Sequence, residues 1–292
     1  MSWMPQTMNT SSTSPYKESQ DGIFRPTWQI SHRDEEYDPA GFATLYEMQE
    51  KHFWYRGRHR FLMHAVNRYL PKGAKQADVI DLGGGVGGWA RCLDQARPGG
   101  FSELALADSS EIALQMASRV LGSRVHRYQI DLMNLGWVAR WDAAFLLDVI
   151  EHLPDDAGAV SQAAQALKPG GYLFITTPAL KQFWSYNDEL ASHLRRYNRN
   201  DYRDLATRTG LELCDVRYFM FFLSPLYWVS RKSKNIEGMS EDRKMQLMVD
   251  SHKVPTAPIN MLLAAIFSAE TPIGHWLPFP WGTSVLGVFQ KK

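Results

Sequence analysis

The strongest chemical signal in the sequence is the glycine-rich segment at residues 81–88, which reads DLGGGVGG. A strand-like apolar run precedes this segment, and a helical pattern follows it. Glycine allows a ligand to approach the backbone closely, and it tolerates the positive φ of such a turn. Gly83, Gly85 and Gly88 fit the GxGxxG pattern of dinucleotide-binding loops, whereas Gly83, Gly85 and Gly87 fit a GxGxG loop. The glycines alone therefore leave the ligand open.

Three aspartates at predicted strand ends narrow the choice of ligand. Asp81 stands two residues before the first glycine, where a carboxylate suits a positively charged amine better than a pyrophosphate. Asp108 ends the next predicted strand and can accept hydrogen bonds from both hydroxyls of a ribose. Asp131 follows the third strand, at a place suited to the amino group of a purine. Together they indicate S-adenosylmethionine (SAM) rather than a nicotinamide dinucleotide, although each aspartate alone is also a common turn or cap residue.

With these features the sequence resembles the class I (Rossmann-like) SAM-dependent methyltransferases, in particular the small-molecule group called type 11 or 12. Two further motifs carry the resemblance, LLDVIEHLPD at 147–156 and LKPGGYLFITTP at 167–178. The resemblance implies methyl transfer from SAM to a small-molecule acceptor. The cofactor-binding positions that it implies in the core are Asp81, Gly83, Gly84, Gly85, Gly87, Asp108, Ser109, Asp131, Leu132 and Asp148. Ser109 is alternatively the N-cap of the following helix.

Methyl transfer from a sulfonium is a direct displacement, so the protein must align two reactants and often remove a proton from the acceptor. His152 is one candidate base because imidazole titrates near neutral pH. The alternative is a histidine that ends a turn and packs against the cofactor. The neighbouring Glu151 is expected at the substrate or in a scaffold role.

The segment at 187–205, NDELASHLRRYNRNDYRDL, resembles a family loop that faces the acceptor. It offers His193 as a second candidate base and Tyr197 as a catalytic phenol. Its expected substrate-binding residues are Asp188, Arg195 and Arg196. Since arginine binds carboxylates and phosphates in a bidentate manner, an acceptor with a polar or anionic group is expected. The alternative is an exposed charged loop in which Asn198 caps a helix, and no metal is expected because one histidine among carboxylates is a poor site.

The segment HFWYRGRHRF at 52–61 resembles a helix that closes over the cofactor pocket in this family. Tyr55 and Arg56 are expected at the cofactor, with Arg56 or Arg58 reaching the methionine carboxylate, and Trp54 is expected at the substrate. Aromatic residues on a helix are otherwise core residues. Gly57 is expected to weaken this helix and to mark a hinge.

These candidate residues need a sheet whose strands end at one edge. Apolar runs predict strands at 78–82, 103–107, 125–129, 141–147, 171–177, 211–219 and 283–290. Apolar residues spaced three and four apart predict a helix over 39–69 and others at 89–96, 111–121, 159–167 and 200–209. This order indicates an α/β fold. The expected architecture is a seven-stranded, mostly parallel, doubly wound sheet with N-terminal helices and a helical insertion before the last strand.

The same pattern divides the chain into five segments. They are a disordered tail at 1–24, a helical lid at 25–74, the SAM-binding core at 75–219, an apolar helical cap at 220–282 and the last core strand at 283–292. The tail is rich in Ser, Thr, Pro and Gln and shows no periodicity. The cap is dense in aromatic and aliphatic residues, so a hydrophobic or aromatic acceptor is expected. A dimer interface, peripheral contact with a membrane and ordinary core are the alternatives for this segment.

Composition argues against several other classes of protein. The 292 residues include 32 basic and 31 acidic side chains, for a net charge of +1, so nucleic-acid binding is not expected. Cys92 and Cys214 lie far apart, which argues against a disulfide framework. The sequence shows neither a transmembrane run nor a secretory signal. A cytoplasmic enzyme, monomeric or homodimeric, is expected. The alternative functions are an NAD(P)-dependent oxidoreductase and a non-catalytic subunit with a SAM-type fold.

Overall fold

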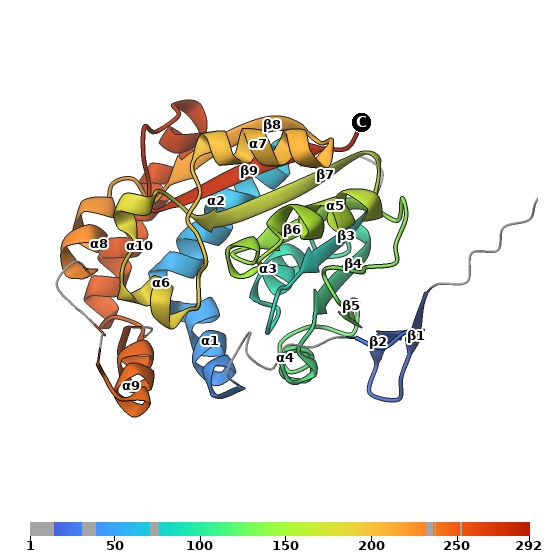
Figure 1. Cartoon of the computed structure of the whole chain (residues 1–292), viewed down its shortest axis with the longest axis horizontal. Helices are drawn as coiled ribbons and strands as arrows, with labels where there is room; N and C mark the ends of the chain where they lie inside the picture. The colour runs from blue at the N-terminus through green and yellow to red at the C-terminus, as the bar shows by residue number, and fades with distance from the viewer. Residues whose placement is uncertain (1–14, 31–38, 71–75, 232–235, 237, 252) are drawn as a thin grey trace, which may run out of the picture.

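A nine-stranded β-sheet runs through the protein in the order β1-β2-β5-β4-β3-β6-β7-β9-β8 (Figure 1). The structure is a computed structural model that describes residues 15–30, 39–70, 76–231, 236, 238–251 and 253–292. The strands are β1 (Tyr16–Glu18), β2 (Ile23–Pro26), β3 (Ala77–Leu82), β4 (Phe101–Asp108), β5 (Val125–Gln129), β6 (Trp141–Leu147), β7 (Leu167–Pro178), β8 (Glu212–Phe219) and β9 (Ser284–Gln290). The predicted α/β class is confirmed, and all seven predicted strands are present.

The middle of the sheet is parallel. From β3 the chain proceeds to β4 and β5 on one side, and it then crosses to β6 and β7 on the other side. Among the strands of the described residues, only β9, between β7 and β8, and the edge strand β1 run antiparallel to their neighbours. The order therefore reverses at β3, and in open α/β sheets ligands bind at the carboxyl ends of the strands at such a reversal.

The two additional strands belong to an N-terminal hairpin. Tyr16 is buried, stacks on Trp137 and donates a hydrogen bond from its hydroxyl to the carbonyl of Leu135 at 2.9 Å. Ile23 is buried in register with Arg127 on β5. The expected disordered tail is thus wrong for residues 15–24, because two apolar anchors fix this polar segment to the sheet edge. Residues 1–14 of that predicted tail lie outside the described residues.

Helices cover both faces of the sheet. One face packs against α5 (Asp156–Ala166) and α7 (Arg199–Thr209), and the other packs against α2 (Phe53–Tyr69), α3 (Gly88–Ala96), α4 (Glu111–Ala117) and α10 (Ala257–Trp276). The remaining elements are α1 (Pro39–Lys51), α6 (Tyr186–Leu190), α8 (Ser224–Arg231), α9 (Glu241–Ser251) and the short 3-10 turns η1 (Ile150–His152) and η2 (Lys181–Phe183). Alternate residues along the strands point into the hydrophobic core on one face of the sheet or the other, as expected for a sheet that is buried on both sides.

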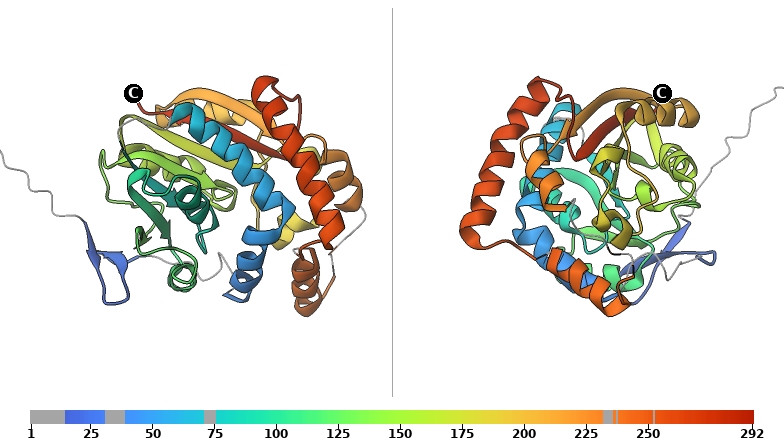
Figure 2. Two further views of the ribbon diagram at one scale, coloured as in Figure 1. Left: turned by 180° about the vertical axis from the view of Figure 1, so that it is seen from behind. Right: turned by 60° about the vertical axis from the view of Figure 1, so that its left-hand side comes forward.

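The N-terminal helical region differs from the prediction in two ways. It is not one helix, because His52 adopts an extended backbone and caps α2 by accepting a hydrogen bond from the Trp54 N–H. Gly57 lies inside α2 and marks no hinge. A Cβ at this position would lie 2.0 Å from the ring of Phe267 on α10, so glycine allows these two helices to pack closely. Figure 2 shows α10 lying along the outside of α2.

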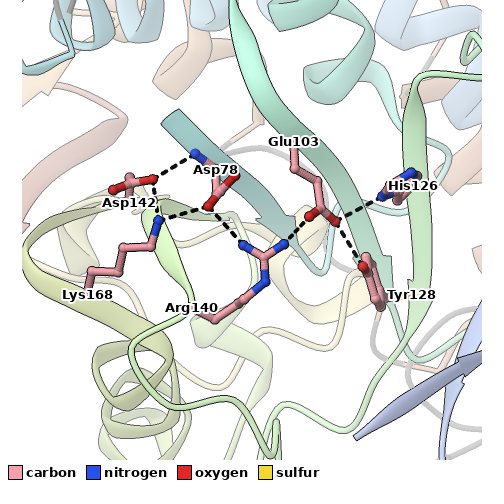
Figure 3. Close-up of polar contacts among 7 residues, drawn as sticks. All are labelled: Asp78, Glu103, His126, Tyr128, Arg140, Asp142 and Lys168. Atoms are coloured by element: carbon pink, nitrogen blue, oxygen red, sulfur yellow. Dashed lines mark hydrogen bonds and ion pairs between the residues drawn. The ribbon is translucent and has the colours of Figure 1, made fainter. Parts of the chain in front are cut away.

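Charged side chains connect the central strands at the end of the sheet that lies away from the glycine loop (Figure 3). Lys168 Nζ lies 2.8 Å from Asp78 and 2.7 Å from Asp142. Arg140 pairs with Asp78 and with Glu103, and Glu103 also accepts hydrogen bonds from the Tyr128 hydroxyl and contacts His126 Nδ1. The network therefore connects β3, β4, β5, β6 and β7 at one end. Among the described residues, no helix has the length and apolarity needed to cross a bilayer.

Candidate active site

The glycine loop connects β3 to α3 at the carboxyl edge of the sheet. Gly83, Gly85 and Gly87 have φ values of 72°, 56° and 81°, in the left-handed region that favours glycine. A Cβ at Gly84, where φ is not positive, would lie 2.4 Å from the carboxylate of Asp81. The loop therefore presents bare backbone next to a carboxylate, as a closely bound ligand requires.

Asp81 is the most unusual group beside this loop. Its side chain is 1% exposed, and neither carboxylate oxygen has a hydrogen-bond partner among the described residues. Burial raises the pKa of Asp81 to about 7, with a further contribution from Asp108, while the Arg58 guanidinium opposes the rise. A buried, unpartnered carboxyl group is costly unless something neutralises or binds it. The position fits the ammonium group of an amino-acid moiety.

Asp108 connects the loop to α4. Its Oδ2 accepts a hydrogen bond from the Gly85 N–H at 2.8 Å, and its Oδ1 accepts one from the Ser110 N–H at 2.9 Å. A carboxylate oxygen can accept more than one hydrogen bond, so these contacts are compatible with ribose hydroxyls as additional donors. Ser110 caps α4, so the alternative interpretation of Ser109 as the N-cap is wrong.

Asp131 and Leu132 follow β5 at the same edge of the sheet. Asp131 holds its own turn, since its Oδ1 accepts a hydrogen bond from the Met133 N–H at 2.9 Å. Leu132 is partly buried against the core.

Arg58, rather than Arg56, points from α2 into the site. Arg58 is buried and forms an ion pair with Asp148, the residue after β6, which has a φ of 57°. The rings of Trp54 and Tyr55 both lie 5.0 Å from the Arg58 guanidinium carbon. Arg56 is exposed and leaves α2 on another side, so the geometry favours Arg58 for the cofactor, and the contact of Arg56 stays a prediction. Successive helical residues are about 100° apart, so residues two positions apart point in nearly opposite directions.

Helix α1 covers the glycine loop from outside. A Cβ at Gly85 would lie 3.6 Å from Leu45, and one at Gly88 would lie 2.3 Å from the side-chain oxygen of Gln49. Neither Leu45 nor Gln49 was predicted at the site, because neither residue belongs to a recognisable motif. The spacing of apolar residues predicted the helix but not the surface on which it packs.

On the other side of Asp148, η1 carries Glu151 and His152. Glu151 is fully buried, and neither oxygen of its carboxylate has a hydrogen-bond partner among the described residues. Burial, followed by the charge of Asp148, raises the pKa of Glu151 well above its usual value. Burial and the neighbouring His193 lower the pKa of His152 to about 4, so His152 is neutral at physiological pH.

The loop after α6 brings His193 to this group. The His193 ring centroid lies 4.8 Å from that of His152. Nδ1 of His193 lies 2.9 Å from Oδ1 of Asp188, and Arg196 binds the same carboxylate through Nε at 2.7 Å and a terminal nitrogen at 3.0 Å. Although burial acts in the opposite direction, the hydrogen bonds from His193 and Arg196 lower the pKa of Asp188 to about 2. Asp188 is therefore ionised and orients the histidine.

Glu151, His152 and His193 also form a group that could hold a divalent cation. One potential ligand atom from each residue lies within 4.8 Å of the others. Two imidazoles and one carboxylate are a common donor set for zinc. The sequence argument against a metal counted only the histidine of the second loop, and it did not bring η1 next to that loop.

Three other predicted site residues are used inside the protein. The Tyr197 hydroxyl is buried and donates to Asp156 at 2.8 Å, which favours a structural role over the predicted catalytic one. Arg195 also pairs with Asp156, at 3.1 Å, and Arg196 forms its bidentate pair with Asp188. These ion pairs favour a structural role for both arginines, and their binding of an anionic acceptor stays a prediction. The alternative role of Asn198 is correct, because this residue caps α7.

Comparison with known proteins settles the family. A family model described as a methyltransferase domain matches residues 53–216, which is more than half of the chain. The chain belongs to the methyltransferase domain family. The resemblance to class I SAM-dependent methyltransferases is confirmed, and with it SAM as the cofactor that this family uses. A nicotinamide dinucleotide is also disfavoured by the antiparallel β9 between β7 and β8, which departs from the parallel dinucleotide-binding order.

Individual relatives are distant from this methyltransferase-family protein. A ubiquinone biosynthesis O-methyltransferase from Leptothrix cholodnii is 27% identical over 151 residues. That alignment covers 48% of this chain and 63% of the relative, so the chain spans less than two thirds of the relative's length.

Two solved structures share the fold over most of the chain. One is phosphoethanolamine N-methyltransferase 2 of Haemonchus contortus in complex with SAM, with a TM-score of 0.55 and 19% identity, covering 92% of this chain and 61% of that one. The other is a methyltransferase in complex with the Haloferax volcanii Trm112 methyltransferase activator, with a TM-score of 0.56 and 17% identity, covering 89% and 99%.

Proposed function

We propose that this protein is a SAM-dependent methyltransferase that methylates a hydroxyl group of a small, apolar or aromatic molecule. The observation that carries the proposal is Asp81, a buried carboxyl group without a hydrogen-bond partner among the described residues, directly before a loop of bare glycine backbone. When bound, SAM supplies an electrophilic methyl group on a sulfonium.

The residues around the loop suit each part of SAM. Asp81 faces the α-ammonium group, and Asp108 accepts hydrogen bonds from the ribose hydroxyls. Asp131, Leu132 and Ser109 flank the adenine. On the opposite side, Arg58 lies beside the rings of Trp54 and Tyr55 and would bind the carboxylate of the methionine part in addition to its ion pair with Asp148.

His193 is the proposed general base. Ionised Asp188 can only accept a hydrogen bond, so the proton of a neutral His193 lies on Nδ1. Its Nε2 then has a free lone pair for the proton of the acceptor. His152 is less suitable, because the low pKa of its imidazolium makes this ring a weak base at neutral pH.

An oxygen acceptor agrees best with this arrangement. Transfer to a hydroxyl requires removal of a proton, which a base oriented by a carboxylate performs. The curated relatives named as O-methyltransferases support the same choice. Because Arg195 and Arg196 are both paired within the protein, the acceptor needs no anionic group at this end of the site. An aromatic residue of α8 lies next to the loop that carries His193, since the Tyr227 hydroxyl is 3.4 Å from an Arg196 nitrogen, and this supports an apolar or aromatic acceptor.

Calorimetry combined with a transfer assay tests the proposal. The protein is titrated with S-adenosylhomocysteine (SAH) and, separately, with NAD and NADP. It is then incubated with SAM and a panel of phenols and catechols, and SAH release is measured. We expect micromolar binding of SAH, none of the dinucleotides, and turnover on at least one phenol. Binding of NAD alone would support the oxidoreductase alternative, whereas SAH binding without turnover on any acceptor would support a non-catalytic subunit.

A further inference from the structure

The outer side of α10 is entirely apolar. Its exposed positions are Ala257, Pro258, Ile259, Met261, Leu262, Ala265, Ala269, Pro272, Ile273 and Trp276. Trp276 is 85% exposed, Met261 is 67% exposed and Leu262 is 61% exposed. A helix of this length is about 30 Å long. Folded proteins rarely leave so long a stripe of large apolar side chains in water unless it binds something.

The inner side of α10 is firmly attached, so the exposed side is fixed by the fold. Phe267 packs against Gly57 on α2. The Asn260 side chain accepts a hydrogen bond from the Phe53 N–H at 2.9 Å and donates one to the Lys51 carbonyl at 2.8 Å. Glu270 accepts a hydrogen bond from the Phe222 N–H at 3.0 Å. Turning the apolar stripe inward would break all of these contacts.

A row of basic residues borders the apolar stripe. Arg56, Arg60 and His64 are four residues apart on the outer edge of α2, and the His64 ring stacks on His275 of α10 with centroids 4.8 Å apart. Within the described part of the chain, neither arginine has an ion-pair partner, and one terminal nitrogen of Arg60 is buried without a hydrogen bond. Burial and the charge of Arg56 lower the pKa of Arg60, which means that both disfavour its charged form. An anion placed here would stabilise that charged form.

We propose that this surface, the outer sides of α10 and α2 taken together, docks the protein on a membrane that contains anionic phospholipids. The apolar stripe would enter the boundary between headgroups and acyl chains, and the arginines would meet lipid phosphates. Trp276 at the end of the stripe suits that boundary, where indole is favoured. A second copy of the chain fits less well, because the same surface offers no exposed carboxylate to pair with the arginines.

Vesicle flotation with the whole protein tests the docking surface. Phosphatidylcholine vesicles are compared with vesicles that also contain phosphatidylglycerol, at low and high salt. We expect binding to the mixed vesicles and loss of that binding in Leu262→Glu. In Arg56→Gln/Arg60→Gln the affinity for mixed vesicles falls roughly thirtyfold, while the weak affinity for pure phosphatidylcholine is unchanged.

Val138→Glu is the matched control, because Val138 is 70% exposed but lies after β5, outside this surface. It should bind vesicles like the wild type. SAH affinity, measured for every variant, reports whether the fold and the cofactor site are intact, and it keeps this test separate from the proposed function. Absence of binding to mixed vesicles, or binding that Leu262→Glu does not weaken, would overturn the proposal. A dimer that Leu262→Glu converts to monomer, without lipid binding, would assign the surface to a second copy instead.

Discussion

His193 and Asp188 form an oriented pair, with Nδ1 of the imidazole 2.9 Å from Oδ1 of a carboxylate that Arg196 grips with two nitrogens. The main-chain N–H of His193 also donates to the Asp188 carbonyl at 2.8 Å. Side chain and backbone therefore hold the histidine in one place. This geometry fixes the tautomer of the ring and leaves Nε2 for a substrate.

Replacing His193 with alanine should slow methyl transfer while SAM binding survives. General-base catalysis typically contributes about 10²–10⁴-fold to a rate, so kcat should fall within that range, with the Kd for SAH unchanged. His152→Ala is the matched comparison, since that ring lies 4.8 Å away but is a weak base, and it should retain more of the rate. Single-turnover kinetics with equal, near-normal rates for both variants would mean that alignment alone drives the step.

Treatment with a chelator distinguishes two roles for His193, a general base and a ligand of a metal ion. Dialysis against EDTA should leave the rate unchanged if His193 removes the proton itself. A rate that falls and then returns with Zn²⁺, Mn²⁺ or Mg²⁺ would contradict the base assignment. It would instead assign Glu151, His152 and His193 to an ion, for which their ligand atoms are close enough.

Asp108→Ala should weaken SAH binding strongly. Hydrogen bonds from the ribose hydroxyls to a charged acceptor are typically worth ~1.5–3 kcal/mol, or roughly 10- to 150-fold in Kd. The structure adds a second reason, because this carboxylate also holds the Gly85 N–H of the loop. Asp131→Ala serves as a control with a smaller expected effect, since that side chain mainly supports its own turn. Calorimetry that shows unchanged affinity for Asp108→Ala would refute the assignment of this strand end.

Asp81 predicts how stability and cofactor binding depend on pH. Its pKa is about 7 in the folded state, above the value of about 4 in an unfolded chain. The folded state therefore holds this proton more tightly, and the stabilisation from Asp81 is complete below about pH 4 and is lost as the pH rises through 7. We expect Asp81→Asn without ligand to lose less thermal stability than the wild type between about pH 4 and about pH 7.

The same group links cofactor binding to protons. An ammonium group beside Asp81 favours the ionised carboxyl, so SAH binding near pH 7 should release a proton. Titrations in two buffers of different ionisation enthalpy measure this release, which should disappear in Asp81→Asn. If the release is the same in both proteins, Asp81 does not face the charged amine.

The sequence predicted those parts of the fold and the site that depend on local pattern. Strand ends, the glycine loop and the helix caps depend on short runs of consecutive residues. The strands were therefore predicted correctly, and Asp81, Asp108 and Asp148 were correctly placed where strands end. Contacts between segments that are far apart in the chain cannot be predicted from the pattern of neighbouring residues. Arg56 and Arg58 differ in the direction in which they leave α2, which the sequence does not show. Tyr197 forms a hydrogen bond and Arg195 an ion pair with Asp156, about forty residues away in the chain. The N-terminal hairpin was missed for the same reason, because its partner β5 lies a hundred residues later.

Gly57→Ala should destabilise the protein without changing the site directly. A methyl group at this position would lie 2.0 Å from the Phe267 ring, so α2 and α10 would have to separate. Overpacking of this kind typically costs about 1–3 kcal/mol, measured as the free energy of unfolding in urea. Phe267→Leu removes part of the obstructing ring and should recover some of the loss when combined with Gly57→Ala. If the two substitutions are simply additive, the close packing of these helices is not the cause.

Arg140→Met should destabilise the protein through the network of Figure 3. The substitution leaves Asp78 and Glu103 without the guanidinium that joins them, and their side chains are 19% and 13% exposed. Because Arg140 itself is 36% exposed, solvent screens the pairs, and we expect a loss of about 1–2 kcal/mol in the free energy of unfolding. Arg124→Met is the control, as Arg124 is 63% exposed and lies 3.5 Å from Asp94, and it should change stability by less than about 0.5 kcal/mol. Adding Glu103→Gln to Arg140→Met should restore part of the loss. If Arg140→Met and Arg124→Met have the same free energy of unfolding in urea, the network contributes no more to stability than an exposed ion pair does.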